Sequence, residues 1–289
     1  MSFQATWTQR VVRTQAIMSA AWHILKEDLS LFLLPVASSL CLLLLVGSYL
    51  VPTIIGWVTD ERFNTGIVYM EPRSQAGLFL FYLVTYATVV FFNAALAACV
   101  LGKLEGREIT IVHGLKEALT CVPQIVGWAV LSATVGLVIK TIERRSGFLG
   151  NLIVQTLGVA WSVATFLVVP VLVAEKKGPF EAVQASVQLV KRTWGEDVLA
   201  GLGFGALYFV LAIPGGFVFV VGAGMITSQL PIAIIVMSLA ILYFPFLGLI
   251  LSTMSTIFDV VLYRYAKLGT ITPGFDGELL KASFPTRSV

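Results

Sequence analysis

The chain has 289 residues, of which 57% are apolar and only 12% carry a charge, whereas charged residues make up about 25% of an average soluble domain. This composition excludes an ordinary water-soluble fold. The net charge of +3 is too small for a nucleic-acid-binding protein, in which basic residues dominate one face, so we expect no nucleic acid among the partners.

Six apolar stretches are long enough to cross a bilayer as helices. The hydrocarbon core is about 30 Å thick and needs about 20 helical residues, because hydrocarbon offers no partner to an unpaired backbone amide. The predicted spans are Leu29 to Val51, Ala76 to Leu101, Cys121 to Ile139, Asn151 to Ala174, Val198 to Val221 and Pro231 to Tyr263. The sequence therefore predicts an all-α fold, a polytopic helical bundle forming one membrane domain over residues 1–289.

The first and last spans have special features. A signal peptide is one interpretation of the first span, but its 28-residue lead carries acids as well as bases and no small-residue cleavage site follows. We therefore expect it to be retained. The last stretch has 33 residues, more than a span needs, and we expect it to bend at Pro245 and to continue as helix into the cytoplasm.

The basic residues fall mainly on one side of the predicted spans. The N-terminal segment, the segments after the second and fourth spans, and the tail over 264–289 hold 14 Lys and Arg, against five on the opposite side. Cytoplasmic loops carry the excess of Lys and Arg. We therefore expect both termini in the cytoplasm, with Lys140, Arg144 and Arg145 as the outer cluster that fits this orientation least well.

Three cytoplasmic segments carry an apolar stripe of helical spacing beside charged residues, each just before a span. The predicted amphipathic helices occupy residues 1–28, Ile111 to Leu119 and Phe180 to Trp194. The chain thus has a threefold pseudo-repeat of amphipathic helix, span out, outer loop and span back. Such helices either lie in the headgroup region, where Lys and Arg meet anionic lipid, or pack on each other as a cytoplasmic layer; both remain open.

Motifs for catalysis and metal binding are nearly absent. The sequence holds no HExxH, GxSxG or P-loop motif and no Cys and His set with metal spacing, so we expect no enzyme activity, no cofactor and no metal. His23 and His113 fall at related places in the first two cytoplasmic helices, and we interpret them as interfacial or packed rather than as a shared metal or proton site. Gly201 and Gly205 are four residues apart at the start of a span, which suits close helix packing better than a dinucleotide loop.

Polar or interrupted positions within the spans are the default place to look for function, because polar groups are costly in hydrocarbon. Asp259 is the only acid embedded in an apolar stretch, and we favour an interface-level ion pair over a proton or cation relay. We interpret Asn93 as an interhelical hydrogen bond rather than a ligand. Pro214, Gly215 and Gly216 interrupt the fifth span, either as a functional hinge of the kind transporters use or as ordinary membrane-helix packing.

Four segments resemble an uncharacterised family of six-span bacterial membrane proteins. They are Arg13 to Pro35 (RTQAIMSAAWHILKEDLSLFLLP), Ile109 to Trp128, Glu181 to Asp197 and Asp259 to Phe275 (DVVLYRYAKLGTITPGF). The chain is also distantly similar to the membrane domain attached to some glycerophosphodiester phosphodiesterases, which is built from helices without catalytic residues of its own. The resemblance implies a helical membrane fold in the bacterial inner membrane, and it brings no activity or binding residues.

Two functions of different classes fit these observations. We favour a non-enzymatic membrane scaffold or lipid-associated partner subunit, which contacts anionic headgroups at the cytoplasmic face and a protein partner or a second copy. The alternative is a small-solute transporter or channel, which requires a hydrated cavity reaching the middle of the bilayer near Pro214 or Asn93. An intramembrane enzyme ranks third, because the spans offer no paired titratable groups for acid and base catalysis.

Overall fold

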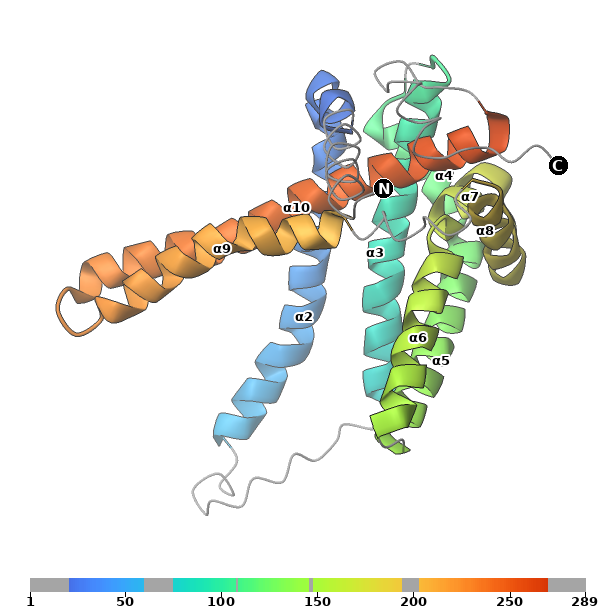
Figure 1. The fold of residues 1–289 in the computed structure, drawn as a ribbon. Coiled ribbons are helices and arrows are strands. Elements are labelled where there is room, and N and C mark those ends of the chain that lie inside the picture. Colours follow the sequence, from blue (N-terminus) through green and yellow to red (C-terminus); the bar gives the residue numbers. More distant parts are fainter. Residues whose placement is uncertain (1–20, 60–74, 108, 146–147, 194–202, 270–289) are drawn as a thin grey trace, which may run out of the picture.

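The structure is a computed structural model and describes residues 21–59, 75–107, 109–145, 148–193 and 203–269 (Figure 1). Within these ranges the regular structure is helical, and residues 21–27 form a helix at the start. The elements that follow are η1 (Leu29–Phe32), α2 (Leu33–Thr59), α3 (Gln75–Leu104), α4 (Ile111–Thr120), α5 (Val122–Arg145), α6 (Phe148–Thr165), α7 (Val168–Glu175), α8 (Pro179–Thr193), α9 (Gly203–Gly224) and α10 (Leu230–Leu268).

The six predicted spans coincide with six helical stretches that are long and apolar enough to cross a membrane, which confirms the all-α fold of a membrane protein in the described part of the chain. The short helices α4 and α8 lie where the second and third cytoplasmic helices were predicted. Of the predicted helix over residues 1–28, residues 1–20 lie outside the described ranges, as do most of the tail over 264–289 and the beginning of the fifth span.

The fourth predicted span consists of two helices rather than one. Helix α6 ends at Thr165 and α7 begins at Val168. Pro170 has no N–H to donate to the carbonyl four residues earlier, so the helix is interrupted there. The backbone N–H of Leu167, which lies in this break, instead donates to Oγ of Ser186 in α8 at 3.1 Å.

Helix α10 is much longer than a bilayer requires. It has 39 residues and is continuous through Pro245, so at 1.5 Å per residue it is about 58 Å long. It ends at Gly269, whose φ of 65° is the left-handed conformation that glycine adopts most easily, and the Gly269 N–H caps the Tyr265 carbonyl. The helix thus runs five residues past Tyr263, where the predicted span ends.

Helix α3 is the centre of the molecule. It contacts α2, α4, α5, α7 and α10, and every residue from Ala94 to Leu101 is buried. Four of these eight residues are alanines, at 94, 95, 97 and 98. Small side chains let neighbouring helices approach closely, which is the main source of helix association in lipid.

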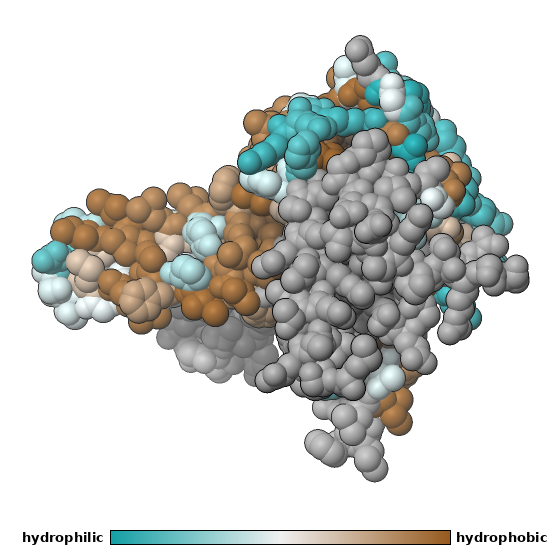
Figure 2. Space-filling view, turned by 45° about the horizontal axis from the view of Figure 1, so that its top comes forward, coloured by the Kyte–Doolittle hydropathy of each residue, from teal (hydrophilic) through white to brown (hydrophobic). Residues whose placement is uncertain are grey.

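The helices α9 and α10 do not join the others in one six-helix bundle. Figure 1 shows α2, α3, α5 and α6 running along one direction, while the hairpin of α9 and α10 lies across them and projects to one side. The C-terminal part of α10 packs on α3, α7 and α8, and because α10 is one continuous helix, this contact sets the direction of the hairpin. Figure 2 shows that the projecting surface is largely hydrophobic.

Candidate functional site: a polar layer at one end of the helices

The ion pairs of the described residues gather at one end of the body formed by α2, α3, α5 and α6. Here η1 begins, α3 ends, α5 begins and α7 ends, and the short helices α4 and α8 lie beside them. The pairs are Lys103–Glu27, Lys103–Asp28, Arg107–Glu105, Lys176–Glu117, Lys177–Glu175 and Lys267–Glu175. In the same region His23 lies 3.1 Å from Glu27 and His113 lies 4.0 Å from Glu117. Charge is therefore concentrated in a layer, which we call the polar layer.

Glu175 is the most connected acid in this layer. Its Oε1 accepts hydrogen bonds from the Tyr263 hydroxyl at 2.8 Å and from Lys267 Nζ at 2.9 Å, and its Oε2 lies 2.6 Å from Lys177 Nζ. Tyr263 and Lys267 stand one turn apart on α10. Glu175 thus ties the end of α7 to the C-terminal part of α10.

The next residue, Lys176, ties α7 to a third and a fourth helix. It caps α7 with a φ of 50°, an uncommon backbone conformation for a residue other than glycine. Its Nζ lies 3.4 Å from Glu117 and 3.2 Å from the Thr120 hydroxyl of α4, while Gln124 of α5 donates to its carbonyl at 3.4 Å. These contacts hold the backbone in its unusual conformation.

Close packing of α4 on α3 brings the second short helix into the layer. A Cβ added at Gly114 would overlap Cys99 Sγ and would lie 2.7 Å from the Ala95 carbonyl oxygen. Only glycine fits at this contact. The Thr110 side chain caps α4 by accepting the His113 N–H, and the Thr110 carbonyl accepts from Cys99 Sγ at 3.8 Å.

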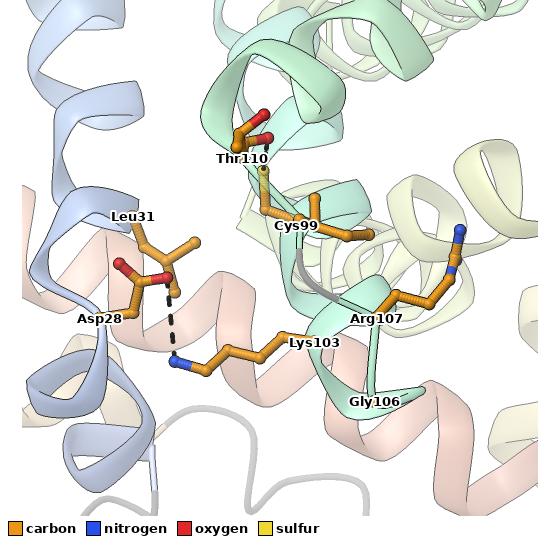
Figure 3. A pocket seen from close by; sticks show the side chains of 8 residues that line it. Asp28, Leu31, Cys99, Lys103, Gly106, Arg107 and Thr110 are labelled. Carbon is orange, nitrogen blue, oxygen red and sulfur yellow. Dashed lines mark hydrogen bonds and ion pairs between the residues drawn. The ribbon is translucent and has the colours of Figure 1, made fainter.

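A cavity of about 450 Å³ opens in the polar layer between η1 and the loop that joins α3 to α4 (Figure 3). Figure 3 shows Asp28 and Lys103 pointing toward one another, with 3.8 Å between Oδ2 and Nζ. The other Asp28 oxygen caps η1 by accepting from Ser30. The lining consists of Asp28, Leu31, Cys99, Lys103, Gly106, Arg107, Ile109 and Thr110.

The predicted polar position Asp259 has no ion pair with another described residue. Lys267 and Tyr263 bind Glu175 instead, because Glu175 at the end of α7 faces that side of α10. Oδ1 of Asp259 is buried without a hydrogen-bond partner among the described residues, and so is Nη1 of Arg264. Asn93 is half-buried in α3, ten residues or about 15 Å before Lys103, so it lies outside the polar layer.

The predicted interruption at Pro214 lies within a continuous helix. Gly215 packs against α10, where an added Cβ would lie 2.5 Å from the Tyr243 ring, and the Tyr243 hydroxyl donates to the Leu211 carbonyl at 2.6 Å. The open space around Gly216 is on another side of the helix. These residues bring α9 and α10 together. Of the predicted packing pair, Gly205 lies near the start of α9 and Gly201 lies outside the described residues.

Several residues of the polar layer were not singled out from the sequence. Glu175 and Lys103 bind partners that are distant in the chain, so no local pattern marks them. A usable signal was present in the first two short helices: His23 to Glu27 and His113 to Glu117 share the sequence His-X-Leu-Lys-Glu, and each histidine pairs with the glutamate four residues later.

A family model described as a family of unknown function (DUF6159) matches residues 73–274. The match covers α3 to α10 and therefore most of the polar layer, but not the first span. No curated protein and no solved structure matches the chain.

Proposed function

Starting from the family of unknown function DUF6159, to which this chain belongs, we propose that the protein is a non-enzymatic, lipid-associated scaffold or partner subunit of the bacterial inner membrane. The observation that carries the proposal is the separation of surfaces. Ion pairs gather in the polar layer at one end, whereas large apolar side chains are exposed along the spans and the hairpin. This arrangement suits a protein whose spans contact acyl chains and whose polar layer faces headgroups.

The short helices support contact between the polar layer and lipid headgroups. Their small residues face the protein: Gly114 and Ala118 are buried in α4, and Ala182 in α8. Some larger apolar residues face outward, with Val112 59% and Phe180 75% exposed, while Leu189 and Val190 of α8 are buried. The two arrangements left open by the sequence are thus compatible, because one face of each amphipathic helix packs on the protein while the other lies at the membrane surface.

The proposed orientation of the protein in the membrane follows from the basic residues. The polar layer contains most of the Lys and Arg of the described chain, so we place it at the cytoplasmic face, with both termini inside and with anionic headgroups as partners. The shared His-X-Leu-Lys-Glu sequence before α2 and before α5 supports the pseudo-repeat in its first two units. We place a protein partner or a second copy beside the spans, and we assign no catalysis, cofactor or nucleic acid.

The transporter alternative is not carried forward. It requires a hydrated path near Pro214 or Asn93, but the Tyr243 side chain packs against Gly215 and its hydroxyl binds the Leu211 carbonyl. The cavity described above lies in the polar layer, about three helical turns from Asn93.

Reconstitution in nanodiscs tests the proposal. The full-length protein is placed in phosphatidylcholine with or without phosphatidylglycerol, and its thermal stability and its crosslinked mass in native membranes are measured. We expect anionic lipid to raise the unfolding temperature and crosslinking to give a species larger than the monomer. A monomer that is indifferent to phosphatidylglycerol and has no crosslinked partner contradicts the proposal.

A matched pair of variants locates the lipid effect. Lys26 and Lys116 are exposed in the polar layer, and replacing both with Gln removes attraction to anionic headgroups of about 1 kcal/mol per residue. Lys140 near the other end of α5 provides the control, since Lys140→Gln makes the same change away from the layer. We expect the double variant to lose the phosphatidylglycerol effect and the control to keep it.

A further inference from the structure

From the cavity in the polar layer we infer a binding site for a zwitterionic phosphoethanolamine headgroup, the primary amine and phosphodiester of an ethanolamine lipid. This inference rests on the proposed placement of the polar layer at a headgroup region, and it adds a defined ligand class to that placement. The cavity of about 450 Å³ falls within the usual range for small-molecule sites, roughly 300–1,000 Å³, and so has room for a headgroup.

The two charges in the cavity face each other without a hydrogen bond. Lys103 Nζ lies 3.8 Å from Asp28 Oδ2 and 3.9 Å from Glu27 Oε2, both beyond hydrogen-bond distance. An ammonium group has three donors and binds phosphate as a point charge. The inserted phosphate would accept from Lys103 while the ligand amine would donate to Asp28, so that one long ion pair becomes two charge-assisted hydrogen bonds.

The balance of charge favours a zwitterion over a polyanion. Among the described lining residues, Asp28 offsets Lys103, and Arg107 is already paired with Glu105. A multiply charged anion near Lys103 would meet the carboxylates of Asp28 and Glu27, which already lie 3.8 and 3.9 Å from the Lys103 ammonium. A primary amine also suits Asp28 better than a quaternary one, because only the primary amine has N–H groups to donate to a carboxylate.

The surroundings of the cavity favour a lipid over a free headgroup. Leu29 follows Asp28 directly and Leu33 lies four residues further on, and the two are 69% and 57% exposed. Leu31 and Ile109 line the cavity itself. A headgroup held by Asp28 and Lys103 would therefore have an exposed apolar surface beside it on which its acyl chains can lie.

Native mass spectrometry of the full-length protein tests the inference. Protein exchanged into equal amounts of phosphatidylethanolamine, phosphatidylcholine and phosphatidylglycerol is released from detergent, and the retained lipids are counted. We expect phosphatidylethanolamine to be retained about tenfold over phosphatidylcholine, the preference that one charge-assisted hydrogen bond supplies. Equal retention of the three lipids overturns the inference but leaves the proposed function standing, since that function is tested by phosphatidylglycerol and by crosslinking.

Two variants test which residue binds the amine of the ligand and which binds its phosphate. Asp28→Asn keeps a side-chain oxygen to cap η1 but removes the charge, so it should abolish the preference for the primary amine with unchanged thermal stability. Lys103→Gln should lower the retention of both phosphatidylethanolamine and phosphatidylcholine about tenfold. Lys140→Gln near the other end of α5 is the matched control outside the cavity and outside the polar layer. If it acts on the preference as strongly as the cavity variants do, the assignment is wrong.

Soluble glycerophosphoethanolamine distinguishes the two possible sources of the ligand. If the site takes a lipid, the soluble compound should fail to displace bound phosphatidylethanolamine at equal concentration, because it lacks the acyl chains that lie on Leu29 and Leu33. Displacement at equal concentration would overturn the lipid source.

Discussion

The body formed by α2, α3, α5 and α6 and the hairpin of α9 and α10 differ in how much of their apolar surface is buried inside the protein. In the most apolar window of α3, 44% of the residues are buried inside the protein, compared with 11% for α9 and 17% for α10. Helix α3 contacts five other helices, while α9 packs chiefly along α10. Helix α3 is therefore held by contacts with several helices, whereas the hairpin is held chiefly by its own seam and leaves many large apolar side chains exposed.

The contacts differ in kind as well as in number. In the body, Gly114 packs against the backbone of α3, which cannot move without displacing the helices packed around it. In the hairpin, Gly215 packs against the Tyr243 ring. A Cβ added at Gly222 would lie 2.8 Å from the Met237 side chain and 3.2 Å from the Met237 backbone nitrogen, so the nearest contact there is a flexible side chain. A body substitution should therefore act on the whole molecule, whereas a hairpin substitution should act locally.

The largest expected effect is at Gly114. Gly114→Leu forces a side chain into the Ala95 carbonyl and Cys99, and we expect a loss of about 3 kcal/mol in unfolding free energy, at the upper end for overpacking. Thermal unfolding in detergent and the monodisperse fraction on size-exclusion chromatography measure it. Gly136→Leu on α5 is the control, because an added Cβ there meets nothing within 4 Å. Equal stability of the two variants would show that α4 is not packed tightly on α3.

The hydrophobic pattern was enough to predict the spans but not the hairpin direction. A run of about 20 apolar residues predicts a helix long enough to cross a membrane from local composition alone, and the described part of the chain has six such helices. The direction of the hairpin depends on contacts such as the one between Lys267 and Glu175, two residues that are 92 positions apart in the chain. No local pattern encodes such a pair.

The residues of the polar layer were equally hard to predict, because their partners are distant in the chain. The sequence drew attention to Asp259 because it stands alone in an apolar stretch, and Glu175 was overlooked because it stands among Lys176 and Lys177 like an ordinary loop acid. Once folded, Glu175 accepts from Tyr263 and Lys267, which follow Asp259 on α10. Likewise, nothing in the sequence distinguishes Ser186 from the other polar residues of α8. It accepts a hydrogen bond from the Leu167 N–H, which is free only because the helix is broken before Pro170.

The second prediction concerns the connection between the two regions. Glu175→Gln removes the charge that binds Lys267 and Lys177, and we expect a loss of about 2 kcal/mol, in the range for hydrogen bonds to charged groups. Hydrogen exchange should rise in the C-terminal turns of α10 and stay unchanged in α9. Glu143→Gln, an exposed acid in the last turn of α5, should leave both unchanged. Unaltered exchange in α10 would mean that apolar packing alone fixes the hairpin.

The third prediction compares adjacent glycines of the hairpin. Gly215→Ala places a methyl group against the Tyr243 ring, which must shift, and we expect a cost of about 1 kcal/mol. Gly216→Ala has open space and should be neutral or slightly stabilising, since alanine favours helix. Hydrogen exchange in α9 and α10 should increase only for the first variant, and exchange in α3 should change in neither. A change in α3 would contradict the separation of hairpin from body.

The smallest expected effect concerns one hydroxyl in the same seam. Pro214 cannot continue the hydrogen-bond ladder of α9, and the Tyr243 hydroxyl donates to the nearby Leu211 carbonyl at 2.6 Å. Tyr243→Phe keeps the ring against Gly215 but removes this donor, so the change isolates the hydrogen bond from the packing. Interhelical hydrogen bonds in membranes average about 0.6 kcal/mol, and we expect a loss of that order, seen as slightly faster exchange in the turn after Leu211. An effect larger than that of Gly215→Ala would mean that hydrogen bonding, rather than the fit of ring to glycine, holds the hairpin together.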